Sequence, residues 1–257
     1  MKRSAVITGA AQGIGRRTAE VLAERGWNLA LFDLKPCLET CEAVKKFGVE
    51  VLDFVGDVTD EKFVQTCAEA LADRWTAPDV VVNNAGISFI CPGEKTAVSD
   101  YRHVLEVNLV APFVVMKTFA PMMLARRSGS FVNVASIAGL FGVADRAAYN
   151  ASKHGLVGLT RTLAAEWGGR GVRCNAVCPG WVKTPMDDSA QAGGLYSDSD
   201  ITNRVPMGRF ASPDDIARAI AFLADGNESG FVNGHTLVVD GGWTADASWE
   251  SLRLGKR

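Results

Sequence analysis

The sequence predicts an α/β fold in which one doubly wound parallel sheet is covered by helices on both faces. Short apolar runs such as residues 5–7, 80–82 and 172–177 alternate along the chain with segments of helical periodicity. Nearly continuous apolar runs are typical of parallel strands that are buried on both faces. Polar or glycine-rich turns follow several of these runs, and ligands bind at such strand ends in parallel sheets.

The composition indicates a single globular domain spanning residues 1–257, because 47% of the residues are hydrophobic and no linker or repeat divides them. The net charge of -2 and the lack of a basic stripe argue against nucleic-acid binding. No apolar run reaches the roughly 18–20 residues of a membrane span. The N-terminus enters a strand pattern without a signal-peptide core, so a cytoplasmic location is expected. The six cysteines and three histidines lack metal-site spacing, so we expect reduced thiols and no metal.

A glycine-rich turn at residues 8–15 follows the first predicted strand and precedes a helix that closes at Gly26. Gly9 allows the tight turn, whereas Gly13 and Gly15 let the backbone and a pyrophosphate approach each other. The free N–H groups and positive dipole of the helix N-terminus would face the phosphates. Strand, glycine turn and helix in this order predict a dinucleotide site.

The second predicted strand, residues 29–32, ends on Asp33, about 18 residues beyond the last glycine. A carboxylate here suits the hydroxyls of a ribose and would repel the 2′-phosphate of NADP. Lys35 weakens that inference, and the alternative is that Asp33 only caps the next turn. We therefore expect NAD to be preferred over NADP.

The α/β alternation continues with a helix through Val44, a strand at 49–55, a helix at 60–75 and a strand at 80–82 that leads into residues 83–86, Asn-Asn-Ala-Gly. Residues 99–127 are mostly helical in pattern, and Pro112 and Pro121 predict a kink or a break. Asn108 lies in an apolar run and needs a hydrogen-bonding partner. A structural clamp on the backbone and a catalytic role explain it equally well.

The strand at 131–135 ends at Ser136, and the helix at 147–167 carries Tyr149 and Lys153 one turn apart. A free phenol has a pKa near ~10, and a nearby ammonium favours its ionised form. Ser136 offers a hydroxyl that can hold a substrate oxygen beside the phenol. Alone, such a pair is more simply an aromatic at a helix end and a solvated charge.

The C-terminal part begins with a strand at 172–177 followed by Cys-Pro-Gly at 178–180. A polar segment at about 186–205 lacks sustained periodicity and is interpreted as a substrate lid. A helix at 212–224 and a strand at 236–239 precede a tail at about 243–257. The apolar tail residues predict packing on a neighbouring subunit or on the same one: Trp243, Trp249, Leu252 and Leu254.

Taken together, these motifs resemble the short-chain dehydrogenase/reductase family over essentially the whole chain. The resemblance rests on residues 8–15, 83–86, Asn108, Ser136, the Tyr149 and Lys153 pair, and Pro179-Gly180. It implies a Rossmann-like, seven-stranded parallel sheet, a homotetramer and a catalytic set of Asn108, Ser136, Tyr149 and Lys153, with Asn108 holding a water that links Lys153 to solvent. It implies cofactor contacts at Gly9, Gln12, Gly13, Ile14, Gly15, Asp33, Asp57, Val58, Asn84, Ala85, Gly86, Tyr149, Lys153, Pro179, Gly180, Val182 and Thr184.

The resemblance further implies an NAD-dependent oxidoreductase that interconverts a secondary alcohol and a ketone. The family varies with its substrate at the positions of Asp145, Arg146 and Trp181. The polar lid favours a small-molecule substrate such as a sugar or polyol, although its acids disfavour a strongly anionic ligand unless Arg146 or Arg204 turns inward. The alternatives are a 3-oxoacyl thioester reductase or general ketone reductase, with a pocket lined by Phe89, Ile90, Trp181 and Met186, and a non-catalytic NAD(H)-binding sensor.

Overall fold

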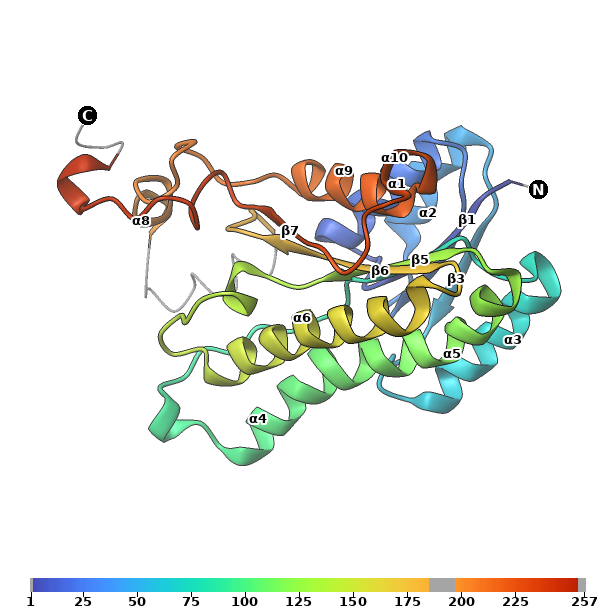
Figure 1. Cartoon of the computed structure of the whole chain (residues 1–257), viewed down its shortest axis with the longest axis horizontal. Coiled ribbons are helices and arrows are strands. Elements are labelled where there is room, and N and C mark those ends of the chain that lie inside the picture. The colour runs from blue at the N-terminus through green and yellow to red at the C-terminus, as the bar shows by residue number, and fades with distance from the viewer. Residues whose placement is uncertain (1, 185–196, 254–257) are drawn as a thin grey trace.

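The computed structural model describes residues 2–184 and 197–253, and these form an α/β fold around one parallel sheet (Figure 1). The seven strands lie in the order β3-β2-β1-β4-β5-β6-β7, and every neighbouring pair is parallel. The predicted seven-stranded, doubly wound sheet is therefore confirmed. The strands are β1 Ser4–Thr8, β2 Asn28–Asp33, β3 Val51–Val55, β4 Val80–Asn83, β5 Gly129–Val134, β6 Val172–Pro179 and β7 Thr236–Val239.

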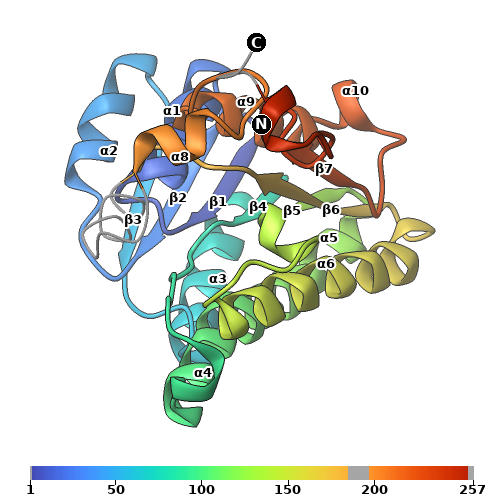
Figure 2. The same ribbon diagram turned by 90° about the vertical axis from the view of Figure 1, so that its left-hand side faces the viewer.

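Helices cover the sheet in two layers, one with α1, α2 and α9 and the other with α3, α5 and α6 (Figures 1 and 2). Alternate residues of β1 enter opposite layers, because Ala5 and Ile7 pack in one core and Val6 packs in the other. Burial on both faces explains the continuous apolar runs. The helices are α1 Gly13–Glu24, α2 Leu38–Val44, α3 Glu61–Trp75, α4 Val98–Leu105, α5 Ala111–Arg126, α6 Ala147–Gly168, α8 Asp198–Thr202, α9 Pro213–Ala224 and α10 Gly226–Ser229.

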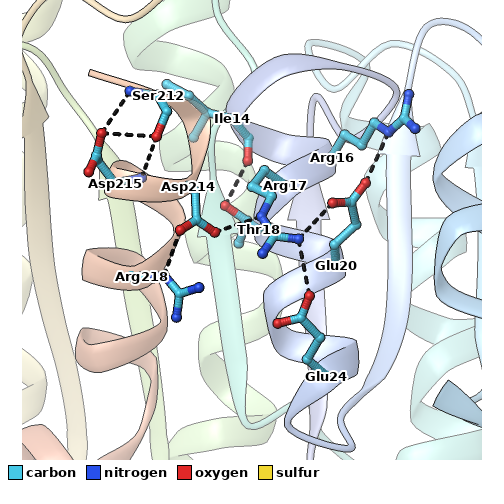
Figure 3. Close-up of polar contacts among 10 residues, drawn as sticks. All are labelled: Ile14, Arg16, Arg17, Thr18, Glu20, Glu24, Ser212, Asp214, Asp215 and Arg218. Atoms are coloured by element: carbon cyan, nitrogen blue, oxygen red, sulfur yellow. Dashed lines mark hydrogen bonds and ion pairs between the residues drawn. The ribbon is translucent and has the colours of Figure 1, made fainter. Parts of the chain in front are cut away.

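Helices α1 and α9 are joined by an ion pair between Arg17 and Asp214, and both arginines that follow the glycine turn pair with acids (Figure 3). Arg17 Nε lies 2.7 Å from Asp214 Oδ1, and its Nη1 also contacts Glu20 and Glu24. Arg16 pairs with Glu20 and Glu39. Both guanidinium groups are therefore neutralised by acids of the protein itself.

The long helical region contains a π-helical segment, Glu106–Val110, between α4 and α5. The predicted irregularity thus occurs before Pro112, which takes the first turn of α5, where a proline is tolerated. Pro121 lies inside α5, which continues past it, so of the expected kink or break there is no break at this proline. Proline has no N–H, so the Lys117 carbonyl loses its usual helical donor. Pro121 and Lys117 both lie on the exposed side of the helix, where water can hydrogen-bond that carbonyl.

The continuous helical stretch Val98–Arg126 is long and apolar enough to cross a membrane by length and composition. Half of its most apolar window is buried inside the fold, and Val115, Met116 and Phe119 are core residues. Core packing therefore accounts for its apolar composition.

The predicted lid includes residues outside the described ranges, namely Met186, Asp187, Asp188, Ser189, Gln191 and Tyr196. Its C-terminal part is helix α8, where the sequence analysis expected no regular structure. Ser197 and Asp200 form a capping box, and the buried Ile201 anchors this short helix. Lys183 contacts Asp198 at 2.8 Å and connects α8 to the segment after β6.

The C-terminal tail packs partly on its own subunit. The ring of Trp243 lies 4.9 Å from the guanidinium carbon of Arg204 and contacts Phe141 edge-on. Trp249 and Leu252 remain exposed in the single chain, and Leu254 lies outside the described residues.

Candidate active site

A cavity of about 500 Å³ opens at the carboxyl ends of the strands, where β1 and β4 lie side by side and the strand order reverses. All but two of the predicted site residues line it: Gly9, Gln12, Gly13, Ile14, Asp33, Asp57, Val58, Asn84, Ala85, Gly86, Ser136, Tyr149, Lys153, Pro179, Gly180, Val182 and Thr184. The exceptions are Gly15 and Asn108. Residues from distant parts of the sequence thus meet in one cavity.

Hydrogen bonds between β1 and β4 hold the glycine turn in place. Asn84 Nδ2 donates to the carbonyl oxygens of Thr8 and Gly9 at 3.0 and 2.9 Å. Thr8 Oγ1 accepts from the N–H groups of Asn84 and Ala85 at 3.0 Å each. Gly9 has a φ of 65°, and a Cβ there would lie 2.9 Å from Ala85 Cα. The turn therefore requires glycine at this position.

Gly13 and Gly15 have different roles, although the sequence analysis assigned both to pyrophosphate approach. A Cβ on Gly15 would lie 2.0 Å from the Gly9 carbonyl oxygen, so Gly15 permits packing of the helix behind the turn. Gly13 has a φ of 57°, lines the cavity and faces open space apart from Thr184 at 3.7 Å. Helix α1 begins here without a side-chain cap. Its free N–H groups and the space above Gly13 fit the pyrophosphate of a dinucleotide.

Asp33 lies at the end of β2 and lines the same cavity. Its Oδ2 accepts from the N–H of Ala11 at 2.9 Å, and its Oδ1 accepts from the N–H of Lys35 at 3.1 Å. The carboxylate is thereby fixed beside the glycine turn, where the ribose of a bound dinucleotide would lie. Capping and ligand binding, the two roles expected for Asp33, are compatible in this geometry.

Ser136, Tyr149 and Lys153 come together at the floor of the cavity. Ser136 follows β5, its hydroxyl accepts from the Ala138 N–H at 3.1 Å, and it lines the cavity together with Tyr149. Lys153 is 5% exposed, and its Nζ donates to the Val134 carbonyl oxygen at 2.9 Å. Nζ also lies 5.7 Å from the centroid of the Tyr149 ring. This arrangement presents a hydroxyl, a phenol and an ammonium to one point in the cavity.

Burial opposes charge on both Tyr149 and Lys153. It raises the pKa of the Tyr149 phenol, while the hydrogen bond from Ser136 and the positive charge of Arg146 lower that pKa in part. It also lowers the pKa of Lys153 from 10.5 to about 8. Ser136 and Arg146 therefore supply the favourable interactions for a phenolate in the free protein, where the sequence analysis expected Lys153 to dominate.

Asn108 is fully buried in the π-helical segment and clamps a neighbouring backbone. Its Oδ1 accepts from the Ile87 N–H at 2.8 Å, and its Nδ2 donates to the Ile87 carbonyl at 2.9 Å and to Ser152 Oγ at 3.2 Å. The structural clamp, one of the two roles expected for this residue, is what the geometry shows.

Several cavity-lining residues escaped the sequence analysis: Ile87, Ser88, His103, Val107 and Val143. Ile87 and Ser88 directly follow the Asn-Asn-Ala-Gly motif, so continuation of that strand-end turn is the signal for them. His103 and Val107 are four residues apart on one helical face, but only the packing of α4 against α6 directs that face inward. Of the apolar lining proposed for the alternative pocket, Trp181 lies in the described cavity wall, whereas Phe89 and Ile90 do not.

A dinucleotide cradle beside a Ser, a Tyr and a buried Lys defines a nicotinamide-dependent oxidoreductase. The family model of the enoyl-(acyl carrier protein) reductases matches residues 9–244. The chain belongs to the short-chain dehydrogenase/reductase family and is an oxidoreductase that acts on CH–OH groups.

Named relatives agree with this assignment. D-threitol dehydrogenase of Mycolicibacterium smegmatis is 38% identical over 93% of this chain and 92% of its own. The solved structure of a candidate NAD(P)-dependent gluconate 5-dehydrogenase of Beutenbergia cavernae, with NADP at low occupancy, has a TM-score of 0.89 and 40% identity over 95% of this chain and 97% of its own. An uncharacterized short-chain dehydrogenase/reductase of Sinorhizobium fredii is 42% identical over 94% of this chain, which spans only 43% of that protein.

The buried Lys153 predicts a conflict between stability and activity. Its lowered pKa corresponds to a cost of about 3 kcal/mol when it is charged, and a methionine avoids that cost. Loss of the hydrogen bond to the Val134 carbonyl cancels about 1 kcal/mol of the stability gained by removing the charge. Lys153→Met should therefore raise the free energy of unfolding at pH 7 by about 1–2 kcal/mol and abolish turnover.

Denaturant titrations at several pH values measure this effect. Between pH 8 and 10.5 the unfolded wild-type chain retains a proton that folded Lys153 has lost. The free energy of unfolding of the wild type should therefore rise with pH in this range, and its difference from that of the variant should shrink. The exposed Lys117→Met serves as the control and should show neither change. A destabilised Lys153→Met protein at pH 7 would contradict the assigned cost of burial.

Proposed function

We propose that the protein is an NAD-preferring dehydrogenase that oxidises one secondary hydroxyl of a small hydroxylated molecule such as a sugar or polyol. The size of the cavity carries this proposal, because about 500 Å³ must hold both the dinucleotide and the substrate. Its wall includes the polar side chains of Ser88, His103 and Arg146. Relatives named for threitol and gluconate support a substrate of this kind.

The reaction follows from the positions of three side chains. Ser136 and Tyr149 hold the carbinol oxygen, and Tyr149 removes its proton as general base. Lys153 holds a positive charge near the phenol and contributes to ribose binding. A bound nicotinamide supplies the acceptor for the hydride.

A 3-oxoacyl thioester reductase or general ketone reductase is the second candidate, and the apolar wall formed by Ile87, Val107, Val143 and Trp181 favours it. An NAD(H)-binding sensor has no need of a phenol held by Ser136 beside a buried lysine. Assays with sugars, polyols, cyclic alcohols and a 3-oxoacyl thioester separate these possibilities. Activity confined to the thioester or to apolar ketones would exclude the sugar or polyol assignment.

Tyr149→Phe should abolish turnover and leave NADH binding nearly unchanged, because only the proton acceptor is lost. We expect kcat to fall by at least about 100-fold, within the range general-base catalysis contributes. Tyr101→Phe is the matched control, since Tyr101 lies on α4 outside the cavity wall. Steady-state rates and NADH fluorescence titrations report the two properties separately. Retained turnover with lost binding would refute the role of Tyr149.

Coenzyme preference should follow the charge around Asp33. Its carboxylate would repel a 2′-phosphate, and Arg16 and Arg17 are already paired with acids (Figure 3). We expect kcat/KM to favour NAD over NADP by at least about tenfold, or roughly 1.4 kcal/mol. Asp33→Asn should bring the ratio of kcat/KM with NAD to kcat/KM with NADP close to one. Asp73 is exposed, and Asp73→Asn should leave this ratio unchanged. Equal kcat/KM values in the wild type would mean that Lys35, also in the cavity wall, outweighs Asp33.

We also propose that the protein is a homotetramer. Val110 and Phe113 on the long helical region and Trp249 in the tail are 38%, 43% and 78% exposed in the single chain. Covering such apolar side chains between subunits is favourable. Light scattering should give the mass of four chains, and a monomer at micromolar concentration would contradict the proposal.

A further inference from the structure

Arg146 lies in the cavity wall close to the catalytic phenol. It is the N-cap residue of α6, three positions before Tyr149. Its Nη1 donates to Ser88 Oγ at 3.0 Å, and its guanidinium carbon lies 5.7 Å from the centroid of the Trp181 ring. Ser88 and Trp181 line the same cavity. The guanidinium is thus held by the wall that the substrate would contact.

The backbone around Arg146 is also fixed. Asp145 has a φ of 61°, which is uncommon for a non-glycine residue. Its carbonyl oxygen accepts from the Cys91 N–H at 2.8 Å, and Cys91 and Arg146 form an isolated parallel bridge. Residues held in this region are over-determined by their surroundings and cluster at ligand sites. The start of α6 is therefore preorganised.

The charge of Arg146 has no acidic partner among the described residues. Arg16, Arg17 and Arg204, by contrast, all pair with carboxylates. The described cavity wall contains two acids, Asp33 and Asp57, and both lie at the ends of β2 and β3, on the other side of β1 from β5 and α6. Helix α6 has no acid in its first turn. A half-buried cation without an anion favours binding of an anionic ligand.

The donor geometry favours a carboxylate over a phosphate. A guanidinium has five N–H donors in a planar fork, and Ser88 takes only one of them. The rest can bind a carboxylate through two parallel hydrogen bonds. The side chains that contact the guanidinium, Ser88 and Trp181, are neutral, and Lys153 is bound to the Val134 carbonyl. A single cation at this part of the wall matches a monoanion, whereas a phosphate dianion would need a second positive group.

We propose that the substrate of this dehydrogenase is a hydroxy acid whose carboxylate binds Arg146 while Ser136 and Tyr149 hold its secondary hydroxyl. This rests on the proposed function and narrows its substrate class to small sugar acids and ring hydroxycarboxylates. Arg146 and Tyr149 are about one helical turn apart, or roughly 5 Å along the axis. The two groups of the substrate are therefore separated by several bonds. The sequence analysis expected an anionic ligand only if Arg146 or Arg204 faced the cavity, and Arg146 does so.

Matched substrate pairs test this assignment in the wild-type enzyme. Gluconate is compared with sorbitol, and 4-hydroxycyclohexanecarboxylate with its carboxamide, under NADH detection. A charge-assisted pair should give at least one acid a kcat/KM about 10- to 100-fold above that of its neutral partner. Wild-type kcat/KM values that favour both neutral members, or that are equal within each pair, would overturn the inference.

Substitution of Arg146 tests the residue itself. In Arg146→Met the ratio of kcat/KM for the acid to kcat/KM for its neutral partner should fall to about one. In Arg146→Lys the preference for the acid should be retained in part. Arg146 also lowers the pKa of Tyr149, so the variant should need a higher pH with every substrate, and the ratio cancels this common effect. Arg161→Met removes an exposed positive charge from the same helix and should leave the ratio unchanged. An unchanged ratio in Arg146→Met would refute the role of Arg146.

Two further measurements keep the outcomes separate. NADH binding shows whether Arg146→Met is folded. If the variant is not folded, inhibition of the wild-type enzyme by cyclohexanecarboxylate is compared with inhibition by its carboxamide. Stronger inhibition by the amide would refute the inference. Oxidation of neutral alcohols without preference for acids would leave the proposed function intact and reject only the carboxylate site. If no alcohol of either kind is oxidised, the proposed function fails and this inference fails with it.

Discussion

The active site depends on how helix α6 docks against the end of β5. Lys153 reaches the Val134 carbonyl at 2.9 Å, and Ser152 hydrogen-bonds both the Tyr149 carbonyl and the Asn108 side chain. The approach is close, because a Cβ on Gly139 would lie 2.8 Å from the Lys153 carbonyl oxygen. A small shift of α6 would break these contacts together, so the positions of the phenol, the ammonium and the cavity wall are set by one packing interface.

The cavity is electrically divided along its length. Asp33 and Asp57 line the cavity at the ends of β2 and β3, whereas Arg146 and Lys153 line it on either side of Tyr149 along the start of α6. This division favours one orientation of a dinucleotide and stabilises negative charge where proton removal creates it. Burial strengthens these effects and also makes them costly, as the lowered pKa of Lys153 shows.

Asn108 and Asn84 show how amide side chains support the site through hydrogen bonds to the backbone. Asn84 joins the glycine turn to β4, and Asn108 fixes the Ile87 backbone beside the catalytic floor. Both bond mainly to backbone groups, and Asn108, which is fully buried, also donates to Ser152 Oγ, as burial of a polar group requires. The π-helical turn allows Asn108 to point at that backbone from within an otherwise apolar helix.

The sequence by itself determined the layered fold and the composition of the site. Apolar runs report burial on both faces of a parallel sheet, and strand-end turns report where ligands bind, because both depend on local patterns. Only the tertiary structure decided that Gly15 packs against Gly9 while Gly13 faces the cavity, that Pro121 remains within a helix, and that Arg146 turns inward without an acidic partner among the described residues. These outcomes depend on contacts between residues far apart in the chain, and such contacts leave no local signal in the sequence.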